Sequence, residues 1–198
     1  MKYISQLNYP DWPYVTRTEM DEAQREKGKT TTVRSSGCGL CSAIMVADRL
    51  RVDSQFGLRE AIDLSYEVNA NINIGTNYKR FAPVFAERLG LEWVPTNDPE
   101  ELRKCLRTGG AAVIHVGGDR EGHVGVFSHK GHYVAAISEE RDGRIAILDP
   151  SYKPGKYDEP HREGKVELKD GVIALCDMQV LVDDSANRNP HFHLFWRK

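Results

Sequence analysis

The spacing of hydrophobic residues differs between the two halves of the chain. In the first half, apolar side chains recur every three or four positions over residues 40–50 and again over residues 81–89, which predicts two amphipathic helices. A third helix is predicted to begin after Asp98, a capping residue followed by proline and two acidic residues, and to end at the glycine pair 109–110. The chain is therefore predicted to be helix-rich up to about residue 108.

After residue 110 the pattern becomes that of β-strands. Short segments rich in β-branched residues alternate with turns of Gly, Asp and Glu, which predicts an antiparallel sheet. These segments cover residues 111–116, 132–137, 144–148 and 172–182. The polar stretch 151–170 between the last two is predicted to be a surface loop.

Together these patterns predict an α+β fold. No linker or internal repeat divides the sequence, so residues 1–198 are expected to form a single domain. Its helical part should span about residues 1–109 and its sheet part about residues 110–198. At 198 residues with 40% hydrophobic side chains, the chain is long enough to bury one substantial core.

Composition and charge narrow the range of partners. The 27 Lys and Arg residues nearly balance the 29 Asp and Glu residues, which argues against binding to nucleic acid or to an anionic membrane surface. No apolar run approaches the roughly 18 residues of a membrane span. The first residues carry no stretch typical of a secretory signal, so we expect a cytoplasmic protein, or a secreted one if a leader has been removed. The oligomeric state is left open.

Four cysteines are too few for a disulfide scaffold, and their spacing offers no second Cys-x-x-Cys for a zinc site. Cys105 and Cys176 stand in apolar segments and are expected to be buried. No metal or organic cofactor is expected.

Cys38 is the candidate nucleophile, because it stands between two glycines where the helix over residues 40–50 begins. Unpaired N–H groups and the positive end of the helix dipole favour a thiolate there. The flanking Gly37 and Gly39 are expected to leave the sulfur open to a substrate, and Ser35 or Ser36 to cap the helix.

Two other interpretations of Cys38 stay open. It can be an ordinary core cysteine in a glycine-shaped turn. It can also form a redox Cys-x-x-Cys with Cys41, although that motif normally follows the first strand of a βαβ unit, and no such strand is predicted here. On the helix, Cys41 is expected to pack inward.

A thiol nucleophile needs a base, and the base needs an orienting group. The sequence has seven histidines. Three stand in polar or terminal segments and are expected to be solvated: His161, His191 and His193. His115 lies within an apolar strand and is expected to be a hydrogen-bonded core residue. The contenders are His123, His129 and His132. A metal site formed by His129 and His132 is disfavoured, because residues three apart on a strand face opposite ways.

His132 opens a predicted strand, and Asp149 closes the next one. If a four-residue loop over residues 139–142 joins the two strands, His132 lies directly opposite Asp149 on the same face. A two-residue turn at residues 142–143 would instead put Asp149 opposite Ala136, out of reach of the histidine. The Asp149-Pro150 step can also simply end a strand.

These residues resemble those of a known group. Ser36-Gly37-Cys38-Gly39 leading into a small, apolar helix, Gly131-His132-Tyr133-Val134 opening a strand, and Leu148-Asp149-Pro150 closing its partner are similar to motifs of the bacteriocin-processing-peptidase-like cysteine peptidases, relatives of the double-glycine leader peptidases. The order Cys, His, Asp and the roughly 17 residues between His and Asp also match. The resemblance covers residues 3–50 and 110–152.

The resemblance implies a papain-like fold of clan CA, in which an N-terminal helical half carries the nucleophile and a C-terminal antiparallel sheet carries His and Asp. It implies Cys38 as nucleophile, His132 as general base, Asp149 as its orienter and Gln6 as an oxyanion donor. An oxyanion donor of this kind is typically worth about a hundred- to a thousandfold in rate. Aromatic residues close to Gln6 are expected to line the cleft; they are Tyr9, Trp12 and Tyr14.

The expected function is therefore that of a cysteine hydrolase, a peptidase or amidase, that acts on a peptide or protein through a thioester acyl-enzyme. One alternative is a catalytically silent papain-fold module that binds peptides, because Leu40-Cys41 stands where the family usually has Pro-Thr, and a charged insert occupies residues 19–29. Another is an NlpC-type cell-wall peptidase with His123 as base, since the segment 122–127 resembles that group's base-bearing strand, although that group's Asp-Cys-Ser nucleophile context is absent.

Overall fold

The computed structural model describes residues 2–14, 31–52, 55–71 and 75–198. Helices dominate before residue 90 and strands after it. The elements in chain order are η1 (Gln6–Asn8), α2 (Val33–Ser36), α3 (Cys38–Arg49), α4 (Leu58–Glu67), α5 (Tyr78–Arg88), β1 (Leu91–Thr96), α6 (Pro99–Arg107), β2 (Ala111–Val116), β3 (His132–Glu139), β4 (Ile145–Leu148), β5 (Glu167–Lys169), β6 (Ile173–Cys176), α7 (Met178–Ser185) and β7 (Phe192–Arg197).

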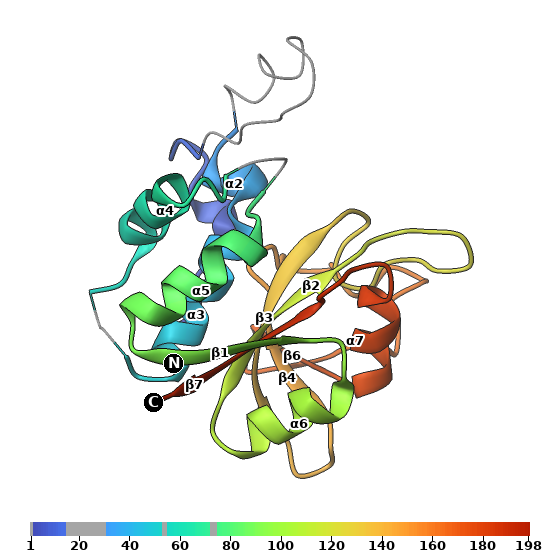
Figure 1. Cartoon of the computed structure of the whole chain (residues 1–198). Coiled ribbons are helices and arrows are strands. Elements are labelled where there is room, and N and C mark those ends of the chain that lie inside the picture. Colours follow the sequence, from blue (N-terminus) through green and yellow to red (C-terminus); the bar gives the residue numbers. More distant parts are fainter. Residues whose placement is uncertain (1, 15–30, 53–54, 72–74) are drawn as a thin grey trace.

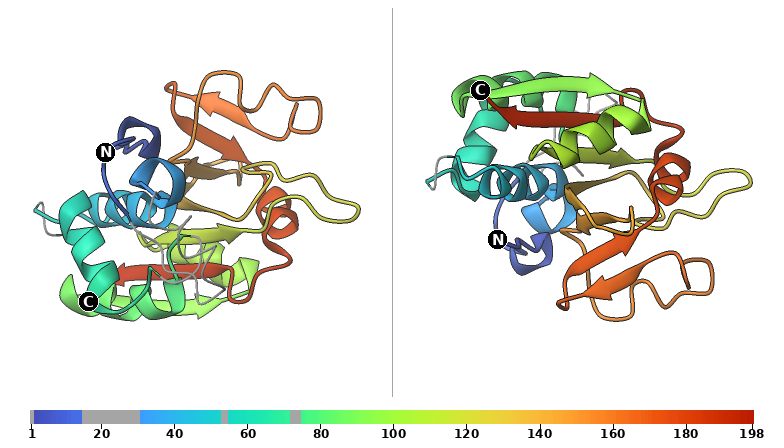
Figure 2. Two further views of the ribbon diagram at one scale, coloured as in Figure 1. Left: turned by 90° about the horizontal axis from the view of Figure 1, so that it is seen from above. Right: turned by 90° about the horizontal axis from the view of Figure 1, so that it is seen from below.

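The described strands form one sheet of seven strands in the order β1-β7-β2-β3-β4-β6-β5, and every neighbouring pair is antiparallel. Figure 2 shows β1 at one edge of the sheet and the β5–β6 hairpin at the other. The central strands β2 and β3 are buried along nearly their whole length. This confirms the expected α+β class and the antiparallel sheet.

Helices cover both faces of this sheet, with α3, α4 and α5 on one face and α6 and α7 on the other (Figure 1). Alternate residues of a strand point to opposite faces, so each central strand contributes to two cores. Val113 and Tyr133 pack with α3 and α5, whereas Ile114 and Val134 pack with α6 and α7. The strands are therefore apolar on both faces, which explains their continuous hydrophobic sequence.

The predicted helices are present. The stripe over residues 40–50 is α3, the stripe over residues 81–89 is α5, and the third is α6. The Asp98 side chain caps α6 by accepting a hydrogen bond from the N–H of Glu100 at 2.8 Å. Gly109 has a positive φ of 86°, a conformation that ends the helix there.

The predicted strand over residues 172–182 is wrong in its second half. Strand β6 ends at Cys176, and α7 begins after Asp177. The extended backbone of Asp177 starts the helix, and Met178 and Leu181 are buried at a helical spacing of three. The β-branched residues Val180 and Val182 had favoured a strand, but packing of the helix against the sheet overrides that preference.

Three strands, β1, β5 and β7, lie outside the predicted sheet segments. Strand β1 falls within the part expected to be helical, and β7 pairs with both β1 and β2. The stretch 151–170 is also more ordered than a surface loop, because it contains β5 and buries Lys156, Tyr157 and Arg162. No helix among the described residues is long and apolar enough to cross a membrane.

Candidate functional site

Cys38 is the first residue of α3, and its side chain lines a cleft. The residue before α3 is Gly37, which also ends the short helix α2. Among the described residues no side chain caps α3, and Ser35 instead bonds to the backbone of Thr32, at the start of α2. The expected cap by Ser35 or Ser36 is therefore wrong, and the first N–H groups of α3 are left for the sulfur and for a ligand.

The glycines around Cys38 allow close packing rather than an open sulfur. A Cβ on Gly37 would lie 2.6 Å from the carbonyl oxygen of Val33, and one on Gly39 would lie 3.0 Å from Tyr78. Only 9% of the Cys38 residue is exposed. The two glycines therefore let the turn from α2 into α3 and the ring of Tyr78 pack closely beside Cys38, so that little of this residue is exposed to the cleft.

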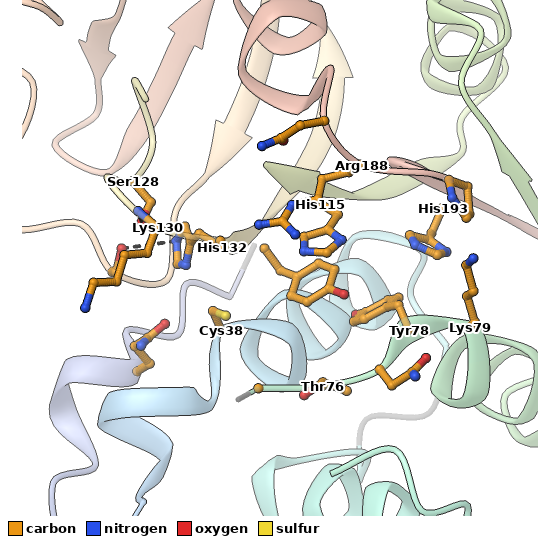
Figure 3. Close-up of a pocket in the computed structure, with 18 of the residues that line it drawn as sticks. Cys38, Thr76, Tyr78, Lys79, His115, Ser128, Lys130, His132, Arg188 and His193 are labelled. Carbon is orange, nitrogen blue, oxygen red and sulfur yellow. Dashed lines mark hydrogen bonds between the residues drawn. The ribbon is translucent and has the colours of Figure 1, made fainter. Parts of the chain in front are cut away.

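His132 is the first residue of β3, and it lies across the cleft from Cys38 (Figure 3). Its Nε2 lies 2.8 Å from Oδ1 of Asp149, which follows β4. The same nitrogen lies 3.1 Å from the Ser151 hydroxyl. Since Nε2 is engaged on that side, Nδ1 is the ring nitrogen left for the thiol.

The strand register that brings these residues together is neither of the two expected. Ala135 pairs with Leu148 and Ser138 with Ala146, with an irregularity at Ile137 between them. Continued by one step, this register would place Asp149 opposite Val134, two residues from His132 on the same face. The histidine and the carboxylate therefore meet diagonally, a separation that long side chains can bridge. The bulge at Ile137 shifts the register, and counting residues along the sequence could not predict it.

Asp149 is fully buried and holds a dense set of hydrogen bonds. Its Oδ1 accepts from the backbone N–H of Ser151 at 2.8 Å, and its Oδ2 accepts from the Tyr157 hydroxyl at 2.7 Å. The ammonium of Lys156, itself buried, forms an ion pair with Oδ2. A carboxylate satisfied in this way stays ionised and fixed, which fixes the ring of His132.

The charges of these groups are coupled. Burial alone would raise the pKa of the Cys38 thiol, but the charge of His132, its hydrogen bond to the sulfur and backbone hydrogen bonds from Tyr133 and Gly39 outweigh burial and lower that pKa. Burial would lower the pKa of His132, yet the charges of Asp149 and Cys38 raise it to about 9. Both shifts favour a thiolate–imidazolium pair over a neutral thiol and imidazole.

The carboxylate completes this arrangement. Burial acts to raise the pKa of Asp149, but the positive charges of His132 and Lys156 hold it well below its usual range. The charges thus alternate along the site: a thiolate at Cys38, an imidazolium at His132, a carboxylate at Asp149 and an ammonium at Lys156. This is the protonation state that a cysteine nucleophile needs before it attacks.

Gln6 lines the same cleft and is almost fully buried. Its backbone N–H donates to the carbonyl of Pro150 at 2.8 Å, and its side-chain Nε2 donates to the carbonyl of Arg34 at 2.7 Å. An amide nitrogen carries two hydrogens, and among the described residues the second finds no acceptor. That N–H is available as a donor, while Oε1 of the same amide is buried and also has no partner among the described residues.

The cleft has a volume of about 830 Å³. The aromatic residues expected to line it do not. Tyr14 is fully buried, with hydrogen bonds to Ser65 and Thr76, while Tyr9 and Trp12 pack against each other edge to face. The charged insert at residues 19–29 lies outside the described residues.

The other contenders for the base lie elsewhere. His123 Nε2 is 2.8 Å from Oδ1 of the buried Asp184, and neither residue lines the cleft. His129 sits at the surface, 3.0 Å from carboxylate oxygens of Asp119 and Glu159. Among the residues that the structure describes, no group of His, Cys, Asp and Glu is arranged to hold a metal ion.

Two expectations about histidines are corrected. His191 and His193 were expected to be solvated but are buried, the latter within β7. His115 is only partly buried, lines the cleft and stacks on Tyr133 at 4.2 Å between ring centres; its side chain has no hydrogen-bond partner among the described residues. His161 is exposed, as expected. Three cysteines, Cys41, Cys105 and Cys176, are buried, as expected.

Sequence reasoning missed Lys156, Tyr157 and Arg188. The first two lie in a polar segment with no apolar period, so nothing local signalled their burial against Asp149. The buried Arg162 holds that segment in place, donating to the carbonyls of Gly125 and Lys156 at 3.0 and 3.1 Å. Arg188 follows a helix that was itself not predicted.

No family model matches this sequence, and no curated protein matches it.

Proposed function

We propose that the protein is a cysteine hydrolase, a peptidase or amidase of papain-like fold, that works through a thioester acyl-enzyme. The observation that carries the proposal is that Cys38 and His132 line one cleft, and that His132 interacts with the thiol on one side and with the buried carboxylate of Asp149 on the other. A nucleophile, a base and an orienter in this order are the general requirement for covalent acyl transfer.

In the proposed reaction the Cys38 thiolate attacks the substrate carbonyl carbon. The carbonyl oxygen becomes an oxyanion, which the free N–H of Gln6 and the backbone N–H of Cys38 stabilise. His132 then gives its Nδ1 proton to the leaving amine, and the collapse of the intermediate leaves a thioester. Water, deprotonated by His132, hydrolyses the thioester and restores the thiolate and the imidazolium.

Two features of the site argue for catalysis over a silent binding module. The pKa of Cys38 is lowered even though the residue is buried, which takes specific donors around the sulfur. Asp149 is a buried charge whose partners include the base, and keeping such a charge solely for structure is costly.

The disulfide-exchange alternative receives less support. Cys41 is fully buried one turn after Cys38, and burial raises the pKa of its thiol far above the ordinary value. A thiol that stays protonated and out of contact with solvent is a poor partner for exchange.

The proposal is tested with an activated ester and with peptides. The wild-type protein is expected to take up one acetyl group on Cys38 from p-nitrophenyl acetate, detected by intact and peptide mass spectrometry, and to cleave members of a mixed-sequence peptide library. Cys38→Ala should lose both reactions. Cys176→Ala, which removes a buried thiol on the other face of the sheet, is the matched control and should keep both. Undiminished hydrolysis by Cys38→Ala would refute the proposal.

A further inference from the structure

The cleft beside Cys38 is lined by cationic side chains. Lys79, Lys130 and Arg188 line it, and none of its described lining residues is Asp or Glu. Within the described part of the chain, none of these three cations forms an ion pair with a carboxylate. The described lining of this cleft is therefore positive, with three cations and no carboxylate around one hollow.

Arg188 lies beside Gly131, the residue that precedes His132. A Cβ on Gly131 would lie 2.6 Å from its Nη2, so the guanidinium lies against the residue that precedes His132, in space that only glycine leaves. The same Nη2 donates to the carbonyl of Gly117 at 3.2 Å, which holds the group in place. Nε is buried and has no acceptor among the described residues. The guanidinium is thus anchored at one nitrogen and retains donors for a ligand.

Two histidines also line the cleft, beside the cations Arg188 and Lys79. His115 is near Arg188, and the buried His193 is near Lys79 (Figure 3). Burial and these neighbouring cations lower the pKa of both histidines to about 3, so each is neutral and has an N–H to donate. Nδ1 of His193 is buried and has no partner among the described residues.

A hollow with unpaired cations, neutral N–H donors and no described carboxylate is suited to an anion. We propose that the side of the cleft formed by Lys79, His115, Arg188 and His193 is a subsite for a carboxylate of the substrate, so that the hydrolase prefers acidic peptides. The inference rests on the proposed function and specifies its substrate class. The carboxylate is either an acidic side chain or the C-terminus of the peptide, since both present the same group.

The test compares two reagents that alkylate Cys38 and differ in charge. Iodoacetate carries a carboxylate and iodoacetamide is its neutral counterpart, so the ratio of their rate constants reports attraction of the carboxylate independently of the thiolate population. In Arg188→Gln the ratio is expected to fall by about fivefold at low salt, and in Lys79→Gln by about twofold. Arg188→Lys should retain most of the ratio. In the wild type, about 0.5 M salt should reduce the ratio of the two rate constants.

The matched control is Lys104→Gln. Lys104 is an exposed cation on α6, which covers the opposite face of the sheet. Its loss should leave the ratio unchanged. A ratio that is the same in the wild type, Arg188→Gln and Lys79→Gln, with Cys38 fast toward iodoacetamide, would overturn the subsite and leave the hydrolase standing. A Cys38 that reacts with iodoacetamide no faster than an ordinary thiol would instead count against the hydrolase itself.

A competition experiment distinguishes the two sources of the carboxylate. N-acetylglutamic acid α-amide carries only a side-chain carboxylate, N-acetylglutamine only a terminal one, and N-acetylglutamine amide neither. Saturable protection of Cys38 from iodoacetamide by one of the first two, lost in Arg188→Gln, supports the proposal and identifies the source. Protection by all three alike, or by none, contradicts it.

Discussion

His132 and Asp149 form a hydrogen bond of 2.8 Å although they are not partners in the β3–β4 ladder. The register would place Asp149 opposite Val134, and the side chains meet on the diagonal. Lys156 and Tyr157, from the segment after β4, then close around the other carboxylate oxygen. The position of His132 is thus set by strand ends and by a loop together.

Asp149→Asn is expected to lower acylation of Cys38 by p-nitrophenyl acetate by about a thousandfold or more, because the uncharged amide no longer stabilises the imidazolium. The alkylation midpoint of Cys38 should move to higher pH in the same variant. Asp142→Asn removes an exposed carboxylate from the β3–β4 turn and should change neither quantity. Equal effects of the two substitutions would show that Asp149 has no role in orienting the base.

Gln6→Ala is expected to slow acylation of the Cys38 thiol much more than its alkylation. Acylation by p-nitrophenyl acetate develops an oxyanion and should slow by about a hundredfold. Alkylation by iodoacetamide develops none and should slow by less than about threefold. Gln179→Ala, an exposed glutamine on α7, serves as the control for both. A parallel loss in both reactions would indicate that Gln6 only holds the structure together.

Lys156→Met is expected to lower the free energy of unfolding by about 3 kcal/mol, since it leaves the buried carboxylate of Asp149 without its ammonium partner. Urea denaturation measures the difference. Lys153→Met removes a cation from an exposed position of the same segment and should cost less than about 0.5 kcal/mol. Similar costs for the two variants would contradict the assigned role of the buried pair.

The thiolate–imidazolium pair also has a signature in stability against pH. His132 has a raised pKa, so above the unfolded value of about 6.5 the folded state holds a proton that the unfolded state loses, and stability falls as pH rises toward 9. Cys38 has a lowered pKa, so below the unfolded value of about 8.5 the unfolded state holds the extra proton, and stability rises with pH. In the wild type the two trends offset each other between about pH 6.5 and 8.5.

Cys38→Ser removes one of these trends. The variant also removes the charge of Cys38, so that Asp149 alone raises the pKa of His132. Its free energy of unfolding should therefore fall more steeply with rising pH than that of the wild type in the lower part of this window, by up to about 1 kcal/mol per pH unit. Urea denaturation of both proteins at several pH values measures the two slopes. If stability changes with pH at the same slope in both proteins, then Cys38 is not ionised by His132 in the folded state.

The sequence predicted those parts of the structure that depend on short stretches of chain. The stripe of α3, the cap of α6 and the strand β2 are set by local periodicity and capping, and all are present. Cys38 was placed at its helix start for the same local reason. The strands β1 and β7 were missed because their pairing joins residues about a hundred positions apart.

The surroundings of the base depended on contacts that no local pattern records. Lys156 stands among polar residues, and only the docking of its segment, held by Arg162, buries it against Asp149. The guanidinium of Arg188 occupies the space that Gly131 leaves because it has no side chain. Both charged side chains look solvated in the sequence. In the structure the side chains of Asp149 and Ser151 hold Lys156, and the carbonyl of Gly117 holds Arg188.

The central claim is that His132 keeps the sulfur of Cys38 ionised at neutral pH. Its most direct test is the rate of Cys38 alkylation by iodoacetamide as a function of pH, followed by peptide mass spectrometry, in the wild type and in His132→Gln. A wild-type midpoint well below the ordinary thiol value of about 8.5 that rises to that value or above it in His132→Gln is the predicted result. A midpoint at or above 8.5 that is the same in both proteins would contradict the account.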